Sequence, residues 1–424
     1  MDQQGETLPT ADAVREAIRA WLAETWRPTY GLVEWRNILV DAGWAAPGWP
    51  RAWFGRDLPP PLVAVVEEEM RRAGAVGPAR AGPRNLASAT LLAHGDDAQK
   101  GRFLRRILTG EDSWCQLFSE PGNGSDLAGA ITRADWRDGR WVINGQKVWT
   151  TSAHHADWGL LLARTDWDVP KHQGLSYFVI DMRQPGVEVR PLRQMNGHAS
   201  FNEVFFTDAE VPAELMVGAR GEGWAVANTT LMHERRGFAG GGGGVGLAEA
   251  GSRQGGIYDE ERAETAIAME PYKWYPQRAG RVDLVIERAR ETGKLSDPVV
   301  RQEIARLLIL SRSADFTARR ARAAQAQGQP PGPEGSIAKL VASHVARAAA
   351  RAHTLISGAD AMLSGADGPH DGIIAEVLVS VPAVSIAGGT DEIQRNILAE
   401  RVLRMPKDGS VDPAKPFREI AGGA

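Results

Sequence analysis

This sequence has one cysteine, no long apolar run and no excess of positive charge. Its single cysteine, Cys115, excludes an intrachain disulfide and is compatible with a reducing compartment. No run of about 18 apolar residues occurs, which excludes a membrane-spanning helix. The formal net charge of -4 provides no basic field for nucleic acid or anionic lipid. We therefore expect a soluble protein with no nucleic-acid partner and no membrane partner.

The remaining composition is ordinary for a globular protein of two or three domains. The chain has 424 residues, of which 43% are apolar and 24% charged. Residues 1–6 are acidic and polar, unlike a secretory or organelle presequence, which predicts a cytoplasmic location. His154 and His155 have no partner at metal-ligand spacing. Gly237 replaces the second histidine of an H-E-x-x-H motif that would begin at His233, so no metal is predicted.

Hydrophobic periodicity divides the chain into three parts. Residues 1–113 show mostly helical spacing, with apolar side chains recurring every three or four positions. Residues 114–222 carry short alternating runs separated by Pro185-Gly186 and Asn196-Gly197 turn signals, which is typical of antiparallel strands. Helical spacing returns over residues 223–424. The pattern predicts an α+β fold with an N-terminal α-helical domain, a middle antiparallel β domain and a C-terminal α-helical bundle.

The segment from Trp114 to Ser152 combines a glycine-rich loop with strand-forming residues. The loop, residues 120–126, contains Pro-Gly and Asn-Gly turn signals, and its glycines allow close approach of the backbone to a ligand. Residues 141–149 predict two strand arms about a tight Asn144-Gly145 turn. The second arm ends in Trp149-Thr150-Thr151, an aromatic face beside hydroxyl groups that suits a flat heterocycle with polar edges. An ordinary surface loop followed by a hairpin has the same residue types.

This segment resembles the flavin-binding signature of the acyl-CoA dehydrogenase family, which has a loop of the form T/S-E-P-x-x-G-S-D and a strand that ends in W-x-T. The loop matches at residues 119–126 and the strand end at residues 149–151. A second family signature matches at residues 388–396 and continues into residues 399–403. The resemblance covers about Trp35 to Pro406. It implies the family's α, β, α architecture, with the flavin and acyl site in the β domain, and FAD as the cofactor.

The resemblance also implies roles for single residues. The main-chain N–H of Gly388, together with a flavin hydroxyl, would hold the thioester carbonyl, and Arg235, Ser125 and Gly389 would contact the substrate. Thr390 would cap the helix that follows it. Contacts with the cofactor are implied at Gln116, Phe118, Ser119, Gly124, Ser125, Trp149, Thr150, Thr151, Thr390 and Glu392.

The catalytic base of the family is a carboxylate, which works best where partial desolvation raises its pKa toward neutrality. Many members carry this glutamate directly before the Gly-Thr of the second signature, but that position is Gly388 here. A smaller branch, resembling isovaleryl- and long-chain-type enzymes, carries it on the helix after the β domain. Glu234, beside Arg235, is at the corresponding point and is the candidate base. A solvated helix face is the ordinary interpretation of such a pair, and a subunit without a complete site is the other explanation of Gly388.

Two stretches after Glu234 depart from the family pattern. The Gly240–Gly244 run is no dinucleotide fingerprint, because no βαβ context surrounds it. Close packing near the flavin or acyl chain and a loop both remain open. Residues 252–280 contain several aromatic residues with little helical period, where relatives continue a helix and then present R-x-x-F-G. That motif is missing, so its cofactor arginine is not carried over, and the aromatic insertion would reshape the acyl pocket or the subunit contact.

The sequence thus predicts an FAD-dependent acyl-CoA dehydrogenase that introduces an α,β double bond into an acyl-CoA thioester, with Glu234 as the base. Family members pass electrons to an electron-transfer flavoprotein and form dimers or tetramers, so we expect a homodimer or homotetramer, with a hetero-oligomer as the alternative. Two other functions remain open. One is a flavin-binding partner subunit without activity of its own, and the other is an oxygen-using flavoenzyme on the same scaffold. Small residues after Glu234 would admit a bulky or branched acyl group.

Overall fold

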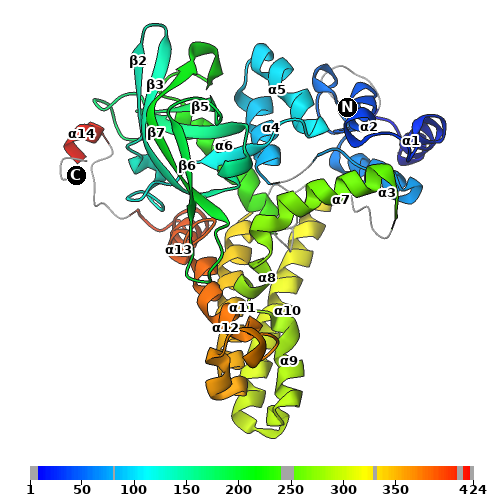
Figure 1. The fold of residues 1–424 in the computed structure, drawn as a ribbon, viewed down its shortest axis with the longest axis vertical. Helices are drawn as coiled ribbons and strands as arrows, with labels where there is room; N and C mark the ends of the chain where they lie inside the picture. Colours follow the sequence, from blue (N-terminus) through cyan, green and yellow to red (C-terminus); the bar gives the residue numbers. More distant parts are fainter. Residues whose placement is uncertain (1–7, 80–81, 240–252, 328–331, 408–413, 421–424) are drawn as a thin grey trace.

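The computed structural model describes residues 8–79, 82–239, 253–327, 332–407 and 414–420. The β domain and the N-terminal helices lie side by side, and the C-terminal bundle projects from beneath them (Figure 1). The predicted order of helices, then strands, then helices is confirmed. The Gly240–Gly244 run lies outside the described residues. Within the described ranges, every helix is too short or too polar to span a bilayer.

The N-terminal helices pack around a buried tryptophan. Trp35 is fully buried, and its indole N–H donates to the carbonyl of Val76 at 2.6 Å. The last of these helices begins with a capping box, in which Asp96 accepts from the N–H of Gln99 and the Gln99 side chain accepts in return. The helices are α1 (Ala11–Thr25), α2 (Leu32–Asp41), α3 (Pro60–Ala73), α4 (Pro83–His94) and α5 (Asp97–Thr109).

The β domain is one sheet whose strands follow the order β6-β7-β3-β2-β4-β5-β8, with β1 beside β4. Most neighbours are antiparallel, as predicted, but β1 pairs with β4 in parallel, and so does β2 at Arg133 and Arg164. The strands are β1 (Trp114–Leu117), β2 (Arg133–Arg137), β3 (Arg140–Thr151), β4 (Trp158–Arg164), β5 (Leu175–Asp181), β6 (Val187–Leu192), β7 (Phe201–Pro212) and β8 (Met216–Val217).

The predicted hairpin turn at Asn144-Gly145 is wrong. Residues 140–151 form one continuous strand, β3, and the turn lies earlier, at Asp138-Gly139, where φ is 50° and 83°. Two adjacent left-handed residues between antiparallel strands are typical of a type I′ turn, which Asp-Gly favours as strongly as Asn-Gly. Gly145 instead lies at a register shift between β3 and β7, and the side chain of Asn144 bonds to Asp208 on β7 at 2.9 Å.

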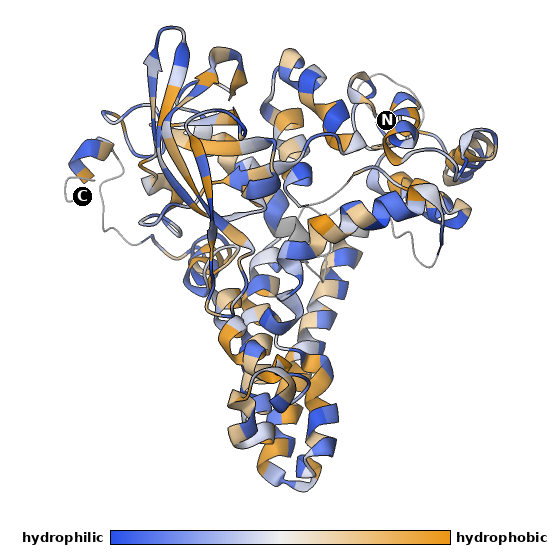
Figure 2. Ribbon diagram, in the orientation of Figure 1, coloured by the Kyte–Doolittle hydropathy of each residue, from blue (hydrophilic) through white to orange (hydrophobic). Residues whose placement is uncertain are grey.

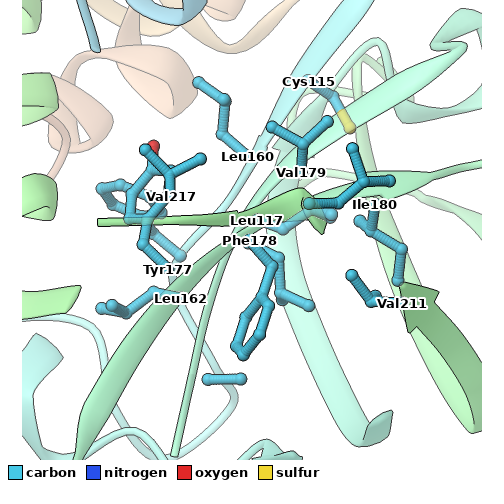
Figure 3. Close-up of a cluster of buried hydrophobic side chains, with 14 of the residues drawn as sticks. Cys115, Leu117, Leu160, Leu162, Tyr177, Phe178, Val179, Ile180, Val211 and Val217 are labelled. Atoms are coloured by element: carbon cyan, nitrogen blue, oxygen red, sulfur yellow. The ribbon is translucent and has the colours of Figure 1, made fainter. Parts of the chain in front are cut away.

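The core of the β domain is built by strands with no polar face. Residues 160–163 of β4 are all completely buried, because helices α4 and α6 pack against this part of the domain. Figure 3 shows Leu160 and Leu162 together with Tyr177 and Phe178 of β5. Cys115 lies in the same cluster, fully buried as expected. The hydrophobic residues concentrate along the central strands, whereas the tip of the β2–β3 hairpin is hydrophilic (Figure 2).

The C-terminal part contains more helix than predicted. Residues 252–280, expected to have little helical period, include α7, which runs from the top of the bundle toward α3 (Figure 1). Alanine, glutamate and arginine drive this helix through their intrinsic propensity, and Glu264 anchors it to Arg36 and Arg84 of the N-terminal domain. The helices are α6 (Gly223–Ala239), α7 (Gly256–Met269), α8 (Tyr275–Arg278), α9 (Val282–Glu291), α10 (Pro298–Ala326), α11 (Glu334–Ser357), α12 (Ile373–Ser380) and α13 (Asp391–Ile397), with the short 3-10 turn η5 (Glu270–Tyr272) before α8.

The last described segment returns to the β domain, where α14 (Phe417–Ile420) lies beside the sheet (Figure 1). The N–H of Phe417 donates to the carbonyl of Val169 at 2.9 Å. The Phe417 ring lies 3.5 Å from the guanidinium of Arg164, which in turn donates to the carbonyls of Ala128 and Ala130. The C-terminal segment therefore supports the region directly after the 119–126 loop.

Candidate active site

A bulge in β3 exposes Trp149. The pairing of β3 with β7 shifts between Lys147 and Thr150, and Trp149 adopts a φ of 61°. A bulge re-aims a side chain, and a left-handed conformation at a bulky residue is costly unless the surroundings impose it. As a result the indole is 55% exposed, although tryptophan is usually well buried. The next residue, Thr150, is 1% exposed, and its hydroxyl has no partner among the described residues.

The loop of residues 119–126 is joined to β3 by a buried ion pair. The Nζ of Lys147 lies 2.8 Å from Glu120 Oε1 and donates to the carbonyl of Phe118 at 3.0 Å. Glu120 also accepts from the N–H groups of Ile131 at 2.7 Å and Thr132 at 2.9 Å. The loop therefore begins at a fixed distance from the strand that carries Trp149. A role for Lys147 was not predicted from the sequence. The available signal was a lysine among strand-forming residues.

Burial and charge act in opposite directions on this pair. Burial alone would raise the pKa of Glu120, but the charge of Lys147 and the hydrogen bonds from Ile131 and Lys147 outweigh it and hold that pKa below its ordinary value. Burial lowers the pKa of Lys147, and the Glu120 carboxylate opposes this effect. Each charge thus opposes the effect of burial on the pKa of the other.

The predicted loop residues differ in exposure. Phe118 is 4% exposed and packs edge-on against Tyr177, while Gly124 and Ser125 lie exposed at the far end of the loop. The carbonyl of Ser119 accepts from the N–H of Val148 at 2.9 Å, directly before Trp149. Ser119 is therefore next to the bulge, and Ser125 is exposed to a ligand arriving from solvent.

Glu234 lies on α6 and meets the first strand of the β domain. The side-chain amide of Gln116 on β1 donates to Glu234 Oε2 at 3.3 Å. Two sequence candidates 118 residues apart are thus brought together. Arg235 follows on the same helix, and its side chain lies outside the described part of the structure.

Buried hydroxyl groups fix the orientation of α6 one turn before Glu234. Thr230 is completely buried, and its hydroxyl lies 2.8 Å from that of Thr90 on α4 and 3.0 Å from that of Tyr177 on β5. Because residues four apart share a helix face, this contact sets the direction in which Glu234 projects. Thr229 adds a second link to α4 through His94 at 2.7 Å.

Thr230→Val should destabilise the protein by about 1–3 kcal/mol, because it leaves the buried hydroxyls of Thr90 and Tyr177 without this partner while changing little volume. The free energy of unfolding from urea titration measures the effect. Thr354→Val is the matched control, since the Thr354 hydroxyl is exposed and bonds only within its own helix. A Thr230→Val loss no larger than that of the control would contradict the structural role assigned to this network.

The second signature is held against α11. Gly388 and Gly389 both have left-handed φ values, 69° and 87°, and Thr390 accepts from the N–H of Ile393 at 3.2 Å, which confirms the predicted helix cap. Asp391 is 2% exposed and pairs with Arg347 of α11 at 2.9 Å. Glu392 is exposed and pairs with Arg395 of its own helix.

Two tyrosines near Glu234 were not assigned from the sequence. The Glu234 charge contributes to the raised pKa values of Tyr272 and Tyr275, behind burial as the larger cause for both phenols. Both side chains are half-buried and come from the aromatic stretch before and within α8. The concentration of aromatic residues in 252–280 was the signal, but their direction depends on how that stretch folds.

A β sheet lies between two helical parts, with an exposed tryptophan on a bulged strand and a carboxylate on the following helix, an arrangement that fits a flavoprotein dehydrogenase. Three family models match in chain order: the acyl-CoA dehydrogenase N-terminal domain at residues 9–111, its middle domain at 115–209 and its C-terminal domain at 277–403. The chain therefore belongs to the acyl-CoA dehydrogenase family and is an oxidoreductase that acts on acyl-CoA.

Relatives extend over nearly the whole chain. Acyl-CoA dehydrogenase IpdE1 of Mycobacterium tuberculosis is 34% identical over 421 residues, which cover 95% of this chain and 99% of the relative. Acyl-CoA dehydrogenase FadE34 of the same organism is 35% identical over 374 residues, 87% of this chain but only 46% of that longer protein. The solved structure of the Tcur3481-Tcur3483 steroid ACAD superimposes with a TM-score of 0.64 at 24% identity, covering 94% of this chain and 98% of that one, and it supports the fold alone.

FAD is the cofactor of this family, and the residues at the bulge fit it. An isoalloxazine ring needs a flat apolar face and polar groups at its edge. Trp149 offers an exposed indole, and Thr150 beside it has a buried hydroxyl that is unpartnered among the described residues. A buried hydroxyl without a hydrogen-bond partner destabilises the protein. A ligand atom that bonds to the Thr150 hydroxyl would remove this cost and so bind more tightly.

Proposed function

We propose that this chain is an FAD-dependent acyl-CoA dehydrogenase in which Glu234 removes the α-proton of the acyl-CoA thioester. When bound, FAD supplies the acceptor for the hydride that leaves the β-carbon. The observation that carries the proposal is the contact between Glu234 and Gln116, because it joins a carboxylate on α6 to the strand that leads into the 119–126 loop. This contact supports a role for Glu234 at the site and argues against a purely solvated helix face.

The surroundings of Glu234 suit a general base. Gln116 is a neutral donor to the Glu234 carboxylate. The buried hydroxyls around Thr230 keep this group in one position.

The second signature would stabilise the thioester oxygen. Loss of the α-proton places negative charge on that oxygen, and main-chain N–H groups held in advance stabilise such charge. Gly388 would provide the N–H, and Gly389, which has no side chain, would let the backbone approach the substrate. Arg235 would contact the substrate. Position 388 then needs no carboxylate, because Glu234 would remove the α-proton.

The cofactor would be held from two directions. From the β domain, Trp149, Thr150 and Thr151 would meet the ring system, with Gln116, Phe118, Ser119, Gly124 and Ser125 lining the approach. From the C-terminal domain, Thr390 and Glu392 would contribute; the exposure of Glu392 leaves it accessible to a ligand. An electron-transfer flavoprotein would receive the electrons, and the working form would be a homodimer or homotetramer.

The test is the visible spectrum of the purified chain before and after anaerobic addition of linear, branched and ring-bearing acyl-CoA thioesters. We expect bound FAD whose absorbance bleaches with at least one of them. Bound FAD that no thioester bleaches would favour a partner subunit without activity, and peroxide formation during aerobic turnover would favour an oxygen-using enzyme. A colourless protein that cannot be reconstituted with FAD would contradict the proposal entirely.

A further inference from the structure

The second signature contains two consecutive glycines, Gly388 and Gly389, whose backbone is left-handed at both positions. Neither glycine has a side chain to restrict its backbone, so contacts from elsewhere must keep the pair in one conformation. Among the described residues, the N–H groups of both glycines have no hydrogen-bond acceptor, which leaves them available to a ligand. A precise role for these donors therefore requires a group that fixes the pair.

Gln394 on α13 binds the carbonyls of both glycines. Its side-chain amide donates to the carbonyl of Gly388 at 3.2 Å and to that of Gly389 at 3.4 Å. The side chain is 1% exposed, so water does not compete for these bonds. In a planar trans peptide the N–H points away from the carbonyl. Each carbonyl that Gln394 holds therefore fixes the direction of the N–H in the same peptide unit and limits rotation at Gly388.

Both ends of the glycine segment are fastened to α11. Before it, the carbonyl of Val384 accepts from the Nζ of Lys339 at 2.6 Å and from the hydroxyl of Ser343 at 3.2 Å. After it, Asp391 lies 3.4 Å from the same Nζ and also pairs with Arg347. Lys339 is 6% exposed and thus contacts both sides of the pair from a buried position. The α11 contacts fix the ends of the segment, and Gln394 fixes its middle.

We propose that Gln394 is a positioning residue that fixes the peptide units of Gly388 and Gly389 so that the N–H of Gly388 is aimed at the thioester oxygen. The inference rests on the proposed role of Gly388 as a donor to that oxygen. Negative charge develops there when the α-proton leaves, and a donor that is already in place stabilises this charge without reorganisation. Gln394 therefore acts on the charged, enolate form of the bound thioester more than on the neutral form.

The experiment compares Gln394→Met with Gln277→Met in the FAD-loaded protein. Methionine has a similar length to glutamine but no N–H to donate. Gln277 is the matched control, because its amide donates at 3.2 Å to Glu376 of α12 in the same domain, away from the glycine pair. In both glutamines the amide oxygen is buried without a hydrogen-bond partner among the described residues. The two variants therefore lose comparable groups.

The probe is a set of 3-oxoacyl-CoA thioesters with the acyl groups of the bleaching panel. Each has an acidic proton whose loss places negative charge on the thioester oxygen, and absorbance follows the enolate as the pH is varied, without turnover. We expect the pKa of the bound thioester to rise by about one pH unit in Gln394→Met, which corresponds to about tenfold weaker stabilisation of the enolate. It should stay at the parental value in Gln277→Met.

The kinetic counterpart is a fall of about tenfold in the bleaching rate of Gln394→Met, with little change in the substrate concentration needed for half-saturation. FAD occupancy and Tm show that each variant is folded. An unchanged pKa of the bound thioester in Gln394→Met would overturn the inference.

Crystal structures of the parent and of Gln394→Met provide a readout that needs no ligand. We expect the Gly388–Gly389 peptide to change its orientation, or to adopt more than one, in the variant. A parent protein that binds no thioester would contradict the proposed function. The crystal structures would still decide the role of Gln394, because an identical single orientation in both proteins would overturn it.

Discussion

Glu234→Gln should reduce the rate of flavin bleaching by acyl-CoA about 10²–10⁴-fold while leaving FAD bound. Glutamine has nearly the same shape as glutamate and retains a carbonyl oxygen for the amide of Gln116, which lies 3.3 Å from Glu234 Oε2. It has no group that accepts a proton at neutral pH. The loss should therefore fall on the chemical step, with little change in the substrate concentration needed for half-saturation.

The measurement is single-turnover bleaching under anaerobic conditions with the most active thioester of the panel. Glu222→Gln is the matched control, because Glu222 lies next to the start of α6, is exposed and accepts from the N–H of Ala219. We expect this variant to bleach at close to the parental rate. A Glu234→Gln protein that keeps more than about a tenth of the parental rate would assign the proton transfer to another group.

The fold was predictable wherever local signals were sufficient. The cap at Thr390 and the turns at Gly186 and Gly197 depend on neighbouring residues alone, and the structure confirms each of them, with φ of 85° at both glycines. The hairpin was misassigned because Asn144-Gly145 and Asp138-Gly139 are equivalent as local turn signals. Only pairing with β7, through Asn144 and Asp208, decides between them.

The candidate site was predictable in its residue types more than in its arrangement. Family motifs pointed to Trp149 and Glu234, but the exposure of Trp149 depends on a register shift against a strand more than 50 residues away. The contact of Glu234 with Gln116 joins two domains. Tyr272 and Tyr275 required the fold of the insertion, whose weak periodicity concealed α7. Long-range packing decides each of these features, and no local pattern encodes it.

Lys147→Met should destabilise the protein by about 3–5 kcal/mol and lower its FAD occupancy, because it leaves the carboxylate of Glu120 buried without its charged partner. Glu120→Gln should have a similar effect by leaving Lys147 unpaired. The double variant should recover much of the loss, since two neutral side chains carry no uncompensated charge. Lys171→Met is the matched control: its pair with Asp126 is at the surface, where such pairs contribute about 0–1 kcal/mol.

The pH dependence of stability provides a second test of the Glu120–Lys147 pair. In the parent, the pKa of Glu120 is held below its ordinary value, so the pair stabilises the fold above the unfolded pKa of about 4.3 and loses that contribution as the pH falls through the lower, folded value. In Lys147→Met, the hydrogen bonds of Ile131 and Thr132 and the charge of Arg164 still oppose burial, but the charge of Lys147 is lost, so the pKa of Glu120 should rise relative to the parent. Acidification from pH 7 toward 5 should then stabilise the variant relative to the parent. Urea unfolding at both pH values measures this difference. Parallel pH profiles for the two proteins, or a loss no larger than that of Lys171→Met, would mean that the Glu120–Lys147 pair does not hold the 119–126 loop in place.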